Sequence, residues 1–268
     1  MSKTAETAMP ILEAKSLGIQ FGGLKAVQDF NMAIYRGELV GLIGPNGAGK
    51  TTVFNMLTGV YQPTEGSFFL DGEKMNGKKP HQVVEAGIAR TFQNIRLFKK
   101  LTAAENVKAA MNMHMKYGLF SALFRRKGYW EEEKEIQGKA LELLELVRLG
   151  DKADVTAENL PYGQQRRLEI ARALATGMKV LLLDEPAAGM NPTETAQLLD
   201  IIRLIREKLN ISVLLIEHDM SLVMKICERM QVIDYGVTIA SGTPEEIADN
   251  PRVIEAYLGK DEEEEDAC

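Results

Sequence analysis

The sequence lacks the features that mark a secreted or membrane-spanning chain. Its 268 residues include only two cysteines, Cys227 and Cys268, which excludes a disulfide framework and offers no metal-site spacing. No stretch reaches the ~20 apolar residues of a membrane-spanning helix, because charged and polar residues interrupt the nearest one, at 107–124. The N-terminal residues show no signal-peptide pattern. We therefore expect a protein of a reducing compartment that reaches a membrane only through partner proteins.

The sequence also has fewer basic than acidic residues, with 32 Lys and Arg against 38 Asp and Glu. The formal net charge is −6, whereas a nucleic-acid binder usually carries a basic face. We therefore expect no nucleic-acid partner. With 45% hydrophobic and 26% charged residues, the composition is that of an ordinary globular protein. A chain of this length can bury a sizeable core, as one large domain or as one domain with a subdomain.

Two patterns of apolar residues divide the chain. Strand-like runs separated by glycine-rich turns dominate residues 10–90, and short, fully apolar runs typical of a parallel sheet return after residue 180. Between them, from 101 to 149, apolar residues recur every three or four positions, which predicts helices. The predicted strands are 11–21, 26–35, 39–43, 67–70, 180–183 and 213–216, with a hairpin at 230–240.

These patterns predict a domain organisation. We expect a loose N-terminus at 1–9, a single domain at 10–260 and an acidic, solvated tail at 261–268. Within the domain, a helical subdomain is expected at about 94–165. A further helix is predicted to begin after Asn191, because Asn is a good N-cap, proline follows it, and Glu194 stands three residues on.

A phosphate-binding loop is predicted after the strand at 39–43. Residues 44–51 fit G-x-x-x-x-G-K-[ST], in which glycines let backbone N–H groups point at a phosphate. Lys50 would contact the β- and γ-phosphates of ATP, the Thr51 hydroxyl would ligate Mg²⁺, and the following helix would direct its positive end at the anion. The residues expected to bind the nucleotide here are Gly44, Pro45, Asn46, Gly47, Ala48, Gly49, Lys50, Thr51 and Thr52.

Two carboxylates follow the apolar run at 180–183. Ligands of open parallel sheets bind beyond the carboxyl ends of strands, where Asp184 and Glu185 stand. Asp184 would hold Mg²⁺, directly or through water, and Glu185 would orient and deprotonate an attacking water. Alone, such residues are more often simple acidic strand ends. Together with the phosphate loop they favour an ATP-hydrolysing site.

The two motifs, separated by a long helical segment, resemble the Walker A and Walker B motifs of ABC ATPases. The resemblance covers roughly residues 11–259. It implies an α/β P-loop NTPase fold, with a RecA-like core, an antiparallel β subdomain and an inserted helical subdomain. It also implies that Gln93 contacts Mg²⁺ and the permease, that His218 contacts the γ-phosphate, and that Phe21 stacks on adenine. The catalytic residues would be Glu185, His218 and Lys50.

Each of those three assignments has a plainer alternative. Phe21 is about equally well explained as a core or turn aromatic. Gln93 alone would be a solvated side chain, and His218 alone a structural histidine. The order of the motifs along the chain is what favours the functional interpretation.

The resemblance extends to a signature motif that would face the ATP of a second ABC ATPase subunit. Its residues here are Leu160, Pro161, Tyr162, Gly163 and Gln164. Pro161 replaces the usual serine and cannot donate a hydrogen bond, Tyr162 replaces a glycine, and Asn191 replaces the usual D-loop aspartate. Gly163 and the helix after it keep an anion site possible. These departures concern the partner's site more than this chain's own.

A finer resemblance rests on TFQNIRLF, LPYGQQRRLEIARAL, DEPAAGMNP and GTPEEI. These segments are similar to the ATPase subunits of branched-chain amino-acid uptake systems, and extra residues around 111–130 point to the larger of the two. That family implies a second ATPase, two integral-membrane permeases and a periplasmic binding protein. It places the chain on the cytoplasmic face of the inner membrane. The alternative is a soluble ABC ATPase of an assembly system, such as the iron–sulfur type, because hydrolysis motifs do not distinguish the two classes.

Overall fold

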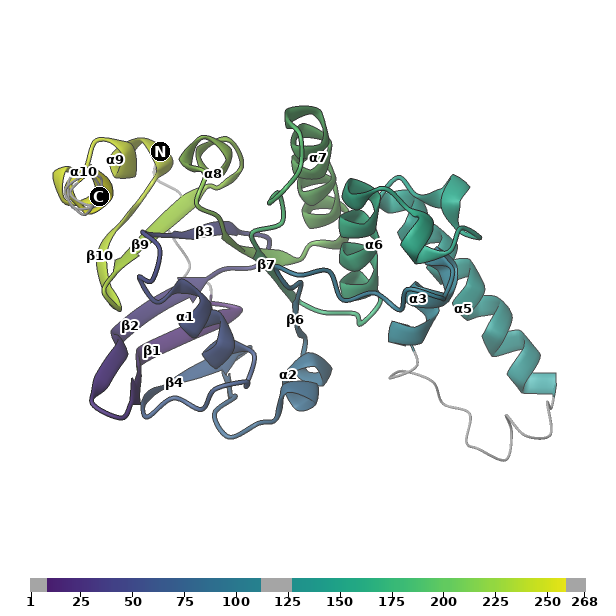
Figure 1. Ribbon diagram of the computed structural model, residues 1–268. Helices are drawn as coiled ribbons and strands as arrows, with labels where there is room; N and C mark the ends of the chain where they lie inside the picture. Colours follow the sequence, from purple (N-terminus) through teal and green to yellow (C-terminus); the bar gives the residue numbers. More distant parts are fainter. Residues whose placement is uncertain (1–8, 112–126, 259–268) are drawn as a thin grey trace, which may run out of the picture. The chain divides into compact units, whose positions relative to one another are not determined.

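The computed structural model describes residues 9–111 and 127–258, which form two compact units (Figure 1). The first unit contains the chain up to Arg90, residues 179–185 and the chain from Arg206. The second contains residues 91–178 and 186–205. The predicted N-terminus, acidic tail and most of the extra segment at 111–130 lie outside the described residues.

A six-stranded sheet organises the first unit. Its strand order is β10-β9-β3-β8-β7-β6, and every neighbouring pair is parallel except β10 with β9. All residues of β3, β7 and β8 are buried, which explains why their sequences are apolar except for Asp184 at the end of β7 and Ser212 at the start of β8. The bounds are β3 Leu39–Ile43, β6 Ile88–Arg90, β7 Val180–Asp184, β8 Ser212–Ile216, β9 Arg229–Asp234 and β10 Val237–Gly242.

A second, antiparallel sheet with the order β2-β1-β4-β5 completes this unit. Helix α1 lies between the two sheets (Figure 1), and its apolar side chains join those of both sheets in one core. The strands are β1 Leu12–Phe21, β2 Leu24–Ile34, β4 Glu65–Leu70 and β5 Glu73–Lys74. The helices are α1 Lys50–Leu57, α2 Pro80–Ala86, α8 Met220–Ile226, α9 Pro244–Ala248 and α10 Pro251–Leu258.

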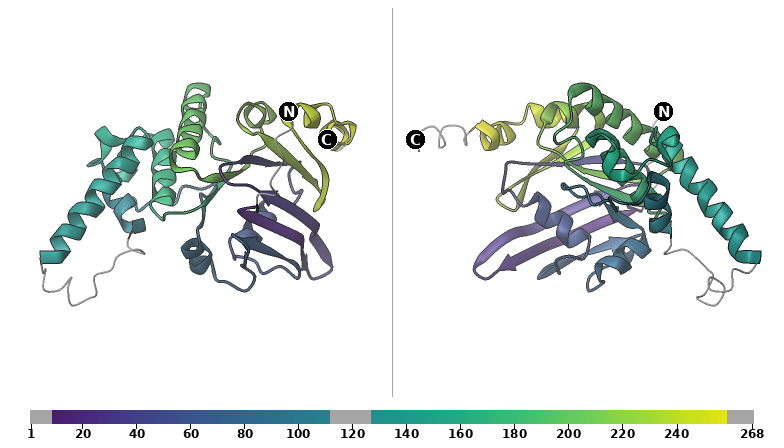
Figure 2. Two further views of the ribbon diagram at one scale, coloured as in Figure 1. Left: turned by 180° about the vertical axis from the view of Figure 1, so that it is seen from behind. Right: turned by 45° about the vertical axis from the view of Figure 1, so that its right-hand side comes forward.

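The second unit is helical. Helices α3, α5 and α6 pack against one another (Figure 2), and Ile136, Ala140 and Leu144 form the buried stripe of α5 that the sequence period predicts. None of the described helices is both long and apolar enough to cross a membrane. The bounds are α3 Ala103–Met111, α5 Lys127–Leu146, η2 Gly150–Lys152, η3 Ala157–Asn159, α6 Tyr162–Leu174 and α7 Pro192–Leu209.

The predicted strands are present with small shifts at their ends, and two local predictions are confirmed in detail. In the hairpin, Tyr235 and Gly236 have φ of 44° and 78°, as a two-residue turn between antiparallel strands requires. At α7, the N–H of Glu194 donates to Asn191 Oδ1 at 2.9 Å, and the N–H of Asn191 donates to Glu194 Oε2 at 3.2 Å. This reciprocal pair is a capping box.

Candidate nucleotide-binding site

The phosphate loop connects the end of β3 to the start of α1. Gly44, Gly47 and Gly49 have φ of 151°, 77° and 108°, conformations that cost little only for glycine. A Cβ added to Gly44 would lie 2.0 Å from the carbonyl oxygen of Ile233, so no side chain fits there. The loop's path therefore depends on the glycines that the motif specifies.

Lys50 places a buried cation at the beginning of this loop. Lys50 is 7% exposed, and its Nζ donates to the carbonyls of Gly44 at 2.6 Å and Pro45 at 2.8 Å. Lys50 is also the first residue of α1, whose leading N–H groups have no acceptor within the helix. The loop, the ammonium group and the helix N-terminus together can bind an anion.

A cavity of about 380 Å³ opens over the loop. It brings together the predicted residues Asn46 to Thr52 and Glu185, and it is also lined by Leu24, Lys25, Ala26 and Tyr235. These four residues were not predicted from the sequence, because a side chain at a strand start or a hairpin turn carries no local sign of a ligand. They line the cavity because β2 and the turn between β9 and β10 lie beside the phosphate loop.

Phe21 lies outside that lining, at the end of β1. Its side chain is exposed at 45%, and its ring meets that of Tyr61 edge-on, with 5.2 Å between centroids. The alternative of a core aromatic is therefore excluded. Its stacking on adenine stays a prediction.

Glu185 and His218 meet because they follow adjacent strands. Asp184 pairs with Ile216 in the β7–β8 register, and Glu185 then donates its N–H to the Ile216 carbonyl at 2.9 Å. Glu185 Oε1 lies 3.9 Å from His218 Nδ1. With φ of 45°, Glu185 adopts a backbone conformation that is costly for a residue with a side chain. Such strain is common at functional positions, and Glu185 is one of the residues that line the cavity.

Asp184 is held by an arginine that was not predicted from the sequence. Arg90 Nη2 donates to Asp184 Oδ2 at 2.6 Å, and the two side chains are only 6% and 8% exposed. Arg90 Nη1 donates to Asn55 Oδ1 of α1 at 2.7 Å, and the guanidinium lies 5.4 Å from the centre of the Phe54 ring. Arg90 therefore joins the helix that follows the phosphate loop to the end of β7.

The oxygen donors at this site suit Mg²⁺ but do not form a cage. Thr51 offers a hydroxyl and Asp184 a carboxylate, both hard ligands. The described residues contain no group of three or more His, Cys, Asp or Glu able to hold a metal ion. This set fits an ion that arrives with a nucleotide and keeps phosphate and water ligands.

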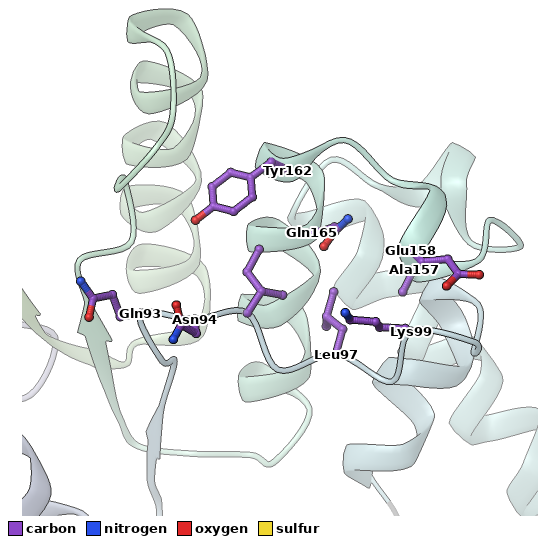
Figure 3. Close-up of a pocket in the computed structure, with 9 residues that line it drawn as sticks. Gln93, Asn94, Leu97, Lys99, Ala157, Glu158, Tyr162 and Gln165 are labelled. Atoms are coloured by element: carbon purple, nitrogen blue, oxygen red, sulfur yellow. The ribbon is translucent and has the colours of Figure 1, made fainter.

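Gln93 and the signature residues lie in the second unit. Gln93, Asn94, Leu97, Tyr162 and Gln165 are among the residues that line a pocket of about 360 Å³ (Figure 3). The structure thus brings the predicted glutamine and part of the signature motif together around one pocket.

The signature motif occupies the start of α6. Pro161 is the N-cap, so the helix begins at Tyr162 and includes Gly163 in its first turn, earlier than the sequence indicates. The Leu160 carbonyl accepts a hydrogen bond from Gln165 Nε2 at 2.8 Å. A Cβ at Gly163 would lie 2.9 Å from Glu194 Oε1, so a larger residue there would require the Glu194 carboxylate to shift.

Comparisons with known proteins identify the family of this chain. A family model described as ABC transporter matches residues 27–188, and one described as Branched-chain amino acid ATP-binding cassette transporter matches residues 237–263. The chain is 50% identical over 251 residues to BraF of Pseudomonas aeruginosa, a high-affinity branched-chain amino acid transport ATP-binding protein, covering 94% of this chain and 98% of BraF. It is 47% identical over 253 residues to LivG of Escherichia coli K12, which has the same description, covering 94% and 99%.

The solved structures support the same conclusion. MJ1267, an ATP-binding cassette of an ABC transporter in its ADP conformation, matches with a TM-score of 0.81 and 30% identity, over 94% of this chain and 99% of that one. The predicted P-loop ABC ATPase fold is confirmed. By its sequence, its fold and its site, the chain belongs to the ABC transporter family, as one of the ATP-binding subunits that hydrolyse ATP.

Proposed function

We propose that this chain powers the uptake of branched-chain amino acids. The support is its identity of 50% and 47% to two such transport ATP-binding proteins and the match of its C-terminal part to a family model of that description. Its partners would be a second ABC ATPase, identical or related, and two integral-membrane permeases, with a periplasmic binding protein acting on the permeases. The chain would then lie at the cytoplasmic face of the inner membrane, and a soluble assembly ATPase is the less favoured alternative.

The cavity shared by residues 46–52 and Glu185 is the observation that carries the assignment of the site. In it, backbone N–H groups of the loop and of the α1 N-terminus would bind the β- and γ-phosphates. Lys50, whose ammonium group lies at the Gly44 and Pro45 carbonyls, would contact the same phosphates. Mg²⁺, when bound, would neutralise phosphate charge, and Thr51, Asp184 and Gln93 would hold it.

Glu185 would accept the proton of the attacking water. Glu185 lines the cavity beside the loop, and general bases must stand within reach of the proton that they remove. His218, 3.9 Å from Glu185 and 59% exposed at its side chain, would fix the water and the γ-phosphate in line. Phe21 would add stacking on adenine.

ATP would also join two ATPase subunits. Leu160 to Gln164 would face the partner's nucleotide, so that ATP binds the closed dimer better than the open one and shifts the equilibrium toward closure. Hydrolysis removes the γ-phosphate and reopens the dimer. The segment after Gln93, through Leu97 and Phe98, would pass this movement to the permeases.

The variant Glu185→Gln tests the assignment of the base. We expect ATP binding near the wild-type level and hydrolysis lower by about 10²-fold or more, the size of a general-base contribution. Glu217→Gln is the matched control, because Glu217 Oε2 is as near to His218 Nδ1, at 3.8 Å, but its side chain is only 2% exposed. Near-normal turnover of Glu185→Gln, or an equal loss in Glu217→Gln, would remove Glu185 from this role.

Recovery of partners tests the transport assignment. The chain, pulled down from its native cells in mild detergent, should bring two integral-membrane permeases and a second ATPase, identified by mass spectrometry. The cargo is then tested in vesicles, where leucine-loaded binding protein should stimulate ATP hydrolysis. Recovery of soluble partners alone would overturn the importer assignment in favour of an assembly ATPase.

A further inference from the structure

A row of three charged residues on α6 faces the segment that contains Gln93. Arg166, Glu169 and Arg172 recur every three residues, so they share one side of the helix. The segment from Phe92 to Phe98 runs along this side, and all of these residues belong to the second unit. Two of the three are almost fully buried, with side-chain exposures of 2% for Arg166 and 7% for Glu169.

These side chains bind the main chain of the segment. Arg166 donates from Nη1 to the Phe92 carbonyl and from Nη2 to the Gln93 carbonyl. Glu169 Oε1 accepts from the N–H groups of Phe92 at 3.5 Å and Arg96 at 3.4 Å. Arg166 and Glu169 also bind each other at 3.0 Å. The forked guanidinium therefore fixes two successive peptide groups, one on each side of the Gln93 Cα.

The row continues beyond Gln93. Arg172 donates to the Arg96 carbonyl, and its guanidinium lies 5.0 Å from the centre of the Phe98 ring. From α3, the fully buried Asn106 accepts from the Phe98 N–H at 2.9 Å and donates to the Phe98 carbonyl at 3.0 Å. The segment is thus held by its backbone at several points, while side chains such as those of Asn94 and Leu97 line the pocket of Figure 3.

Stability alone does not explain this arrangement. Burial raises the pKa of Glu169, and the charge of Arg166 opposes that rise, so the carboxylate is kept in the buried site at a desolvation cost. Buried ion pairs are often replaceable by apolar residues without loss of stability. What an arginine adds is a planar fork that fixes the positions of its acceptors.

We propose that Arg166 and Glu169 are positioning residues for Gln93. They hold it in a fixed relation to the signature motif, because Tyr162, Gly163 and Gln164 begin the same helix. A displacement of the signature motif by the partner's nucleotide would then carry Gln93 with it. The inference rests on the proposed function, in which Gln93 contacts Mg²⁺ and the permease-facing segment follows it.

The test is a mutant cycle on the full-length protein. One change is the paired substitution Arg166→Met with Glu169→Leu, which removes both charges and roughly keeps the volume; the other is Gln93→Ala. The measurements are the Mg²⁺ concentration for half-maximal ATP hydrolysis and the amide hydrogen exchange of residues 91–98. The matched control is Arg167→Met, a change on the neighbouring, partly exposed position of the same helix.

With Gln93 present, the paired substitution should raise the required Mg²⁺ about tenfold, as loss of an outer-shell partner does. The same substitution should accelerate exchange at Phe92 and Arg96. In the Gln93→Ala background it should cause no further change in Mg²⁺ dependence, and Arg167→Met should behave like wild type in both measurements.

Equal shifts in Mg²⁺ dependence in both backgrounds would overturn the proposal, because the pair would then act independently of Gln93. Unchanged exchange of residues 91–98 in the paired variant would overturn it as well. If Gln93→Ala alone leaves Mg²⁺ dependence unchanged, the metal role in the proposed function fails, and the exchange measurement still decides whether the segment is held. Should the paired variant not fold, Arg166→Lys serves instead. It keeps the charge without the fork, and it should show the same pattern with a smaller shift.

Discussion

Replacing Arg90 with methionine removes the guanidinium that joins α1 to the end of β7. The change leaves the Asp184 carboxylate, 8% exposed, without its partner at 2.6 Å. It also removes the donor at 2.7 Å from Asn55 Oδ1. Methionine is of similar length and keeps an apolar contact with the Phe54 ring beneath it. The lost interactions are therefore the charge and its hydrogen bonds rather than the packing.

The expected cost follows from burial of both partners. Removing one member of a buried ion pair typically destabilises by about 3–5 kcal/mol, because the other charge stays uncompensated. The loss at Asn55 belongs to the same side chain and is not added in full. At about 2–4 °C per kcal/mol for chains of this size, the unfolding midpoint should fall by roughly 10 °C.

Urea unfolding followed by far-ultraviolet circular dichroism measures this cost. Asp184→Asn supplies the second arm of a mutant cycle, since it removes the carboxylate charge and leaves Arg90 alone. The double variant should be less destabilised than the sum of the two single variants, by several kcal/mol. A cost below about 1 kcal/mol for Arg90→Met, the range of exposed pairs, or additive single effects, would refute the reasoning.

Two further predictions concern the carboxylate of Asp219 and the thiol of Cys227. Asp219 caps α8, where Ser221 and Leu222 donate to its carboxylate and the Ser221 hydrogen bond lowers its pKa. Asp219→Ala should cost about 1 kcal/mol in urea unfolding at pH 7. Because folding lowers this pKa, the stabilisation is full above about pH 4 and is lost as the pH falls through the folded-state pKa. A difference in unfolding free energy between wild type and Asp219→Ala that stays constant down to pH 3 would contradict this. Cys227 is buried, and burial raises the pKa of its thiol. In a Cys268→Ser variant, a thiol reagent should therefore label Cys227 only as fast as the protein unfolds. Fast labelling in native buffer would contradict the burial.

Features with a local physical cause were predictable from the sequence. The loop at 44–51 needs glycine at specific backbone angles, so its residues and its conformation are linked directly. The carboxylates at the end of β7 and the Asn191 cap likewise follow from short patterns. The meeting of Glu185 with His218 was not a local feature. It depends on the pairing of β7 with β8, and the sequence assigned the two residues to one site only through the resemblance to ABC ATPases.

Features that depend on long-range contacts were not predictable. Arg90 and Asp184 are 94 residues apart, and Arg166 meets the Phe92 carbonyl across 74 residues. In the sequence, a single arginine beside an apolar run is normally interpreted as a solvated side chain. The strand β6 has only three residues, which is too few for a periodic pattern. The sequence around Arg90 therefore did not predict that its side chain is buried.

Arg90 and Arg166 have buried side chains, and each of them joins two segments of a site. Arg90 joins the helix of the phosphate loop to Asp184, and Arg166 joins the signature helix to the backbone at Gln93. Each position carries a desolvation cost that an apolar pair would avoid, so a gain in stability does not account for either. A guanidinium directs two donors in one plane. The acceptors of Arg90 lie on two different segments, α1 and β7, and those of Arg166 are two successive carbonyls of one segment. We therefore expect these arginines to fix the relative positions of the segments that they join. It follows that lysine, which keeps the charge and lacks the fork, should preserve stability better than activity at both positions.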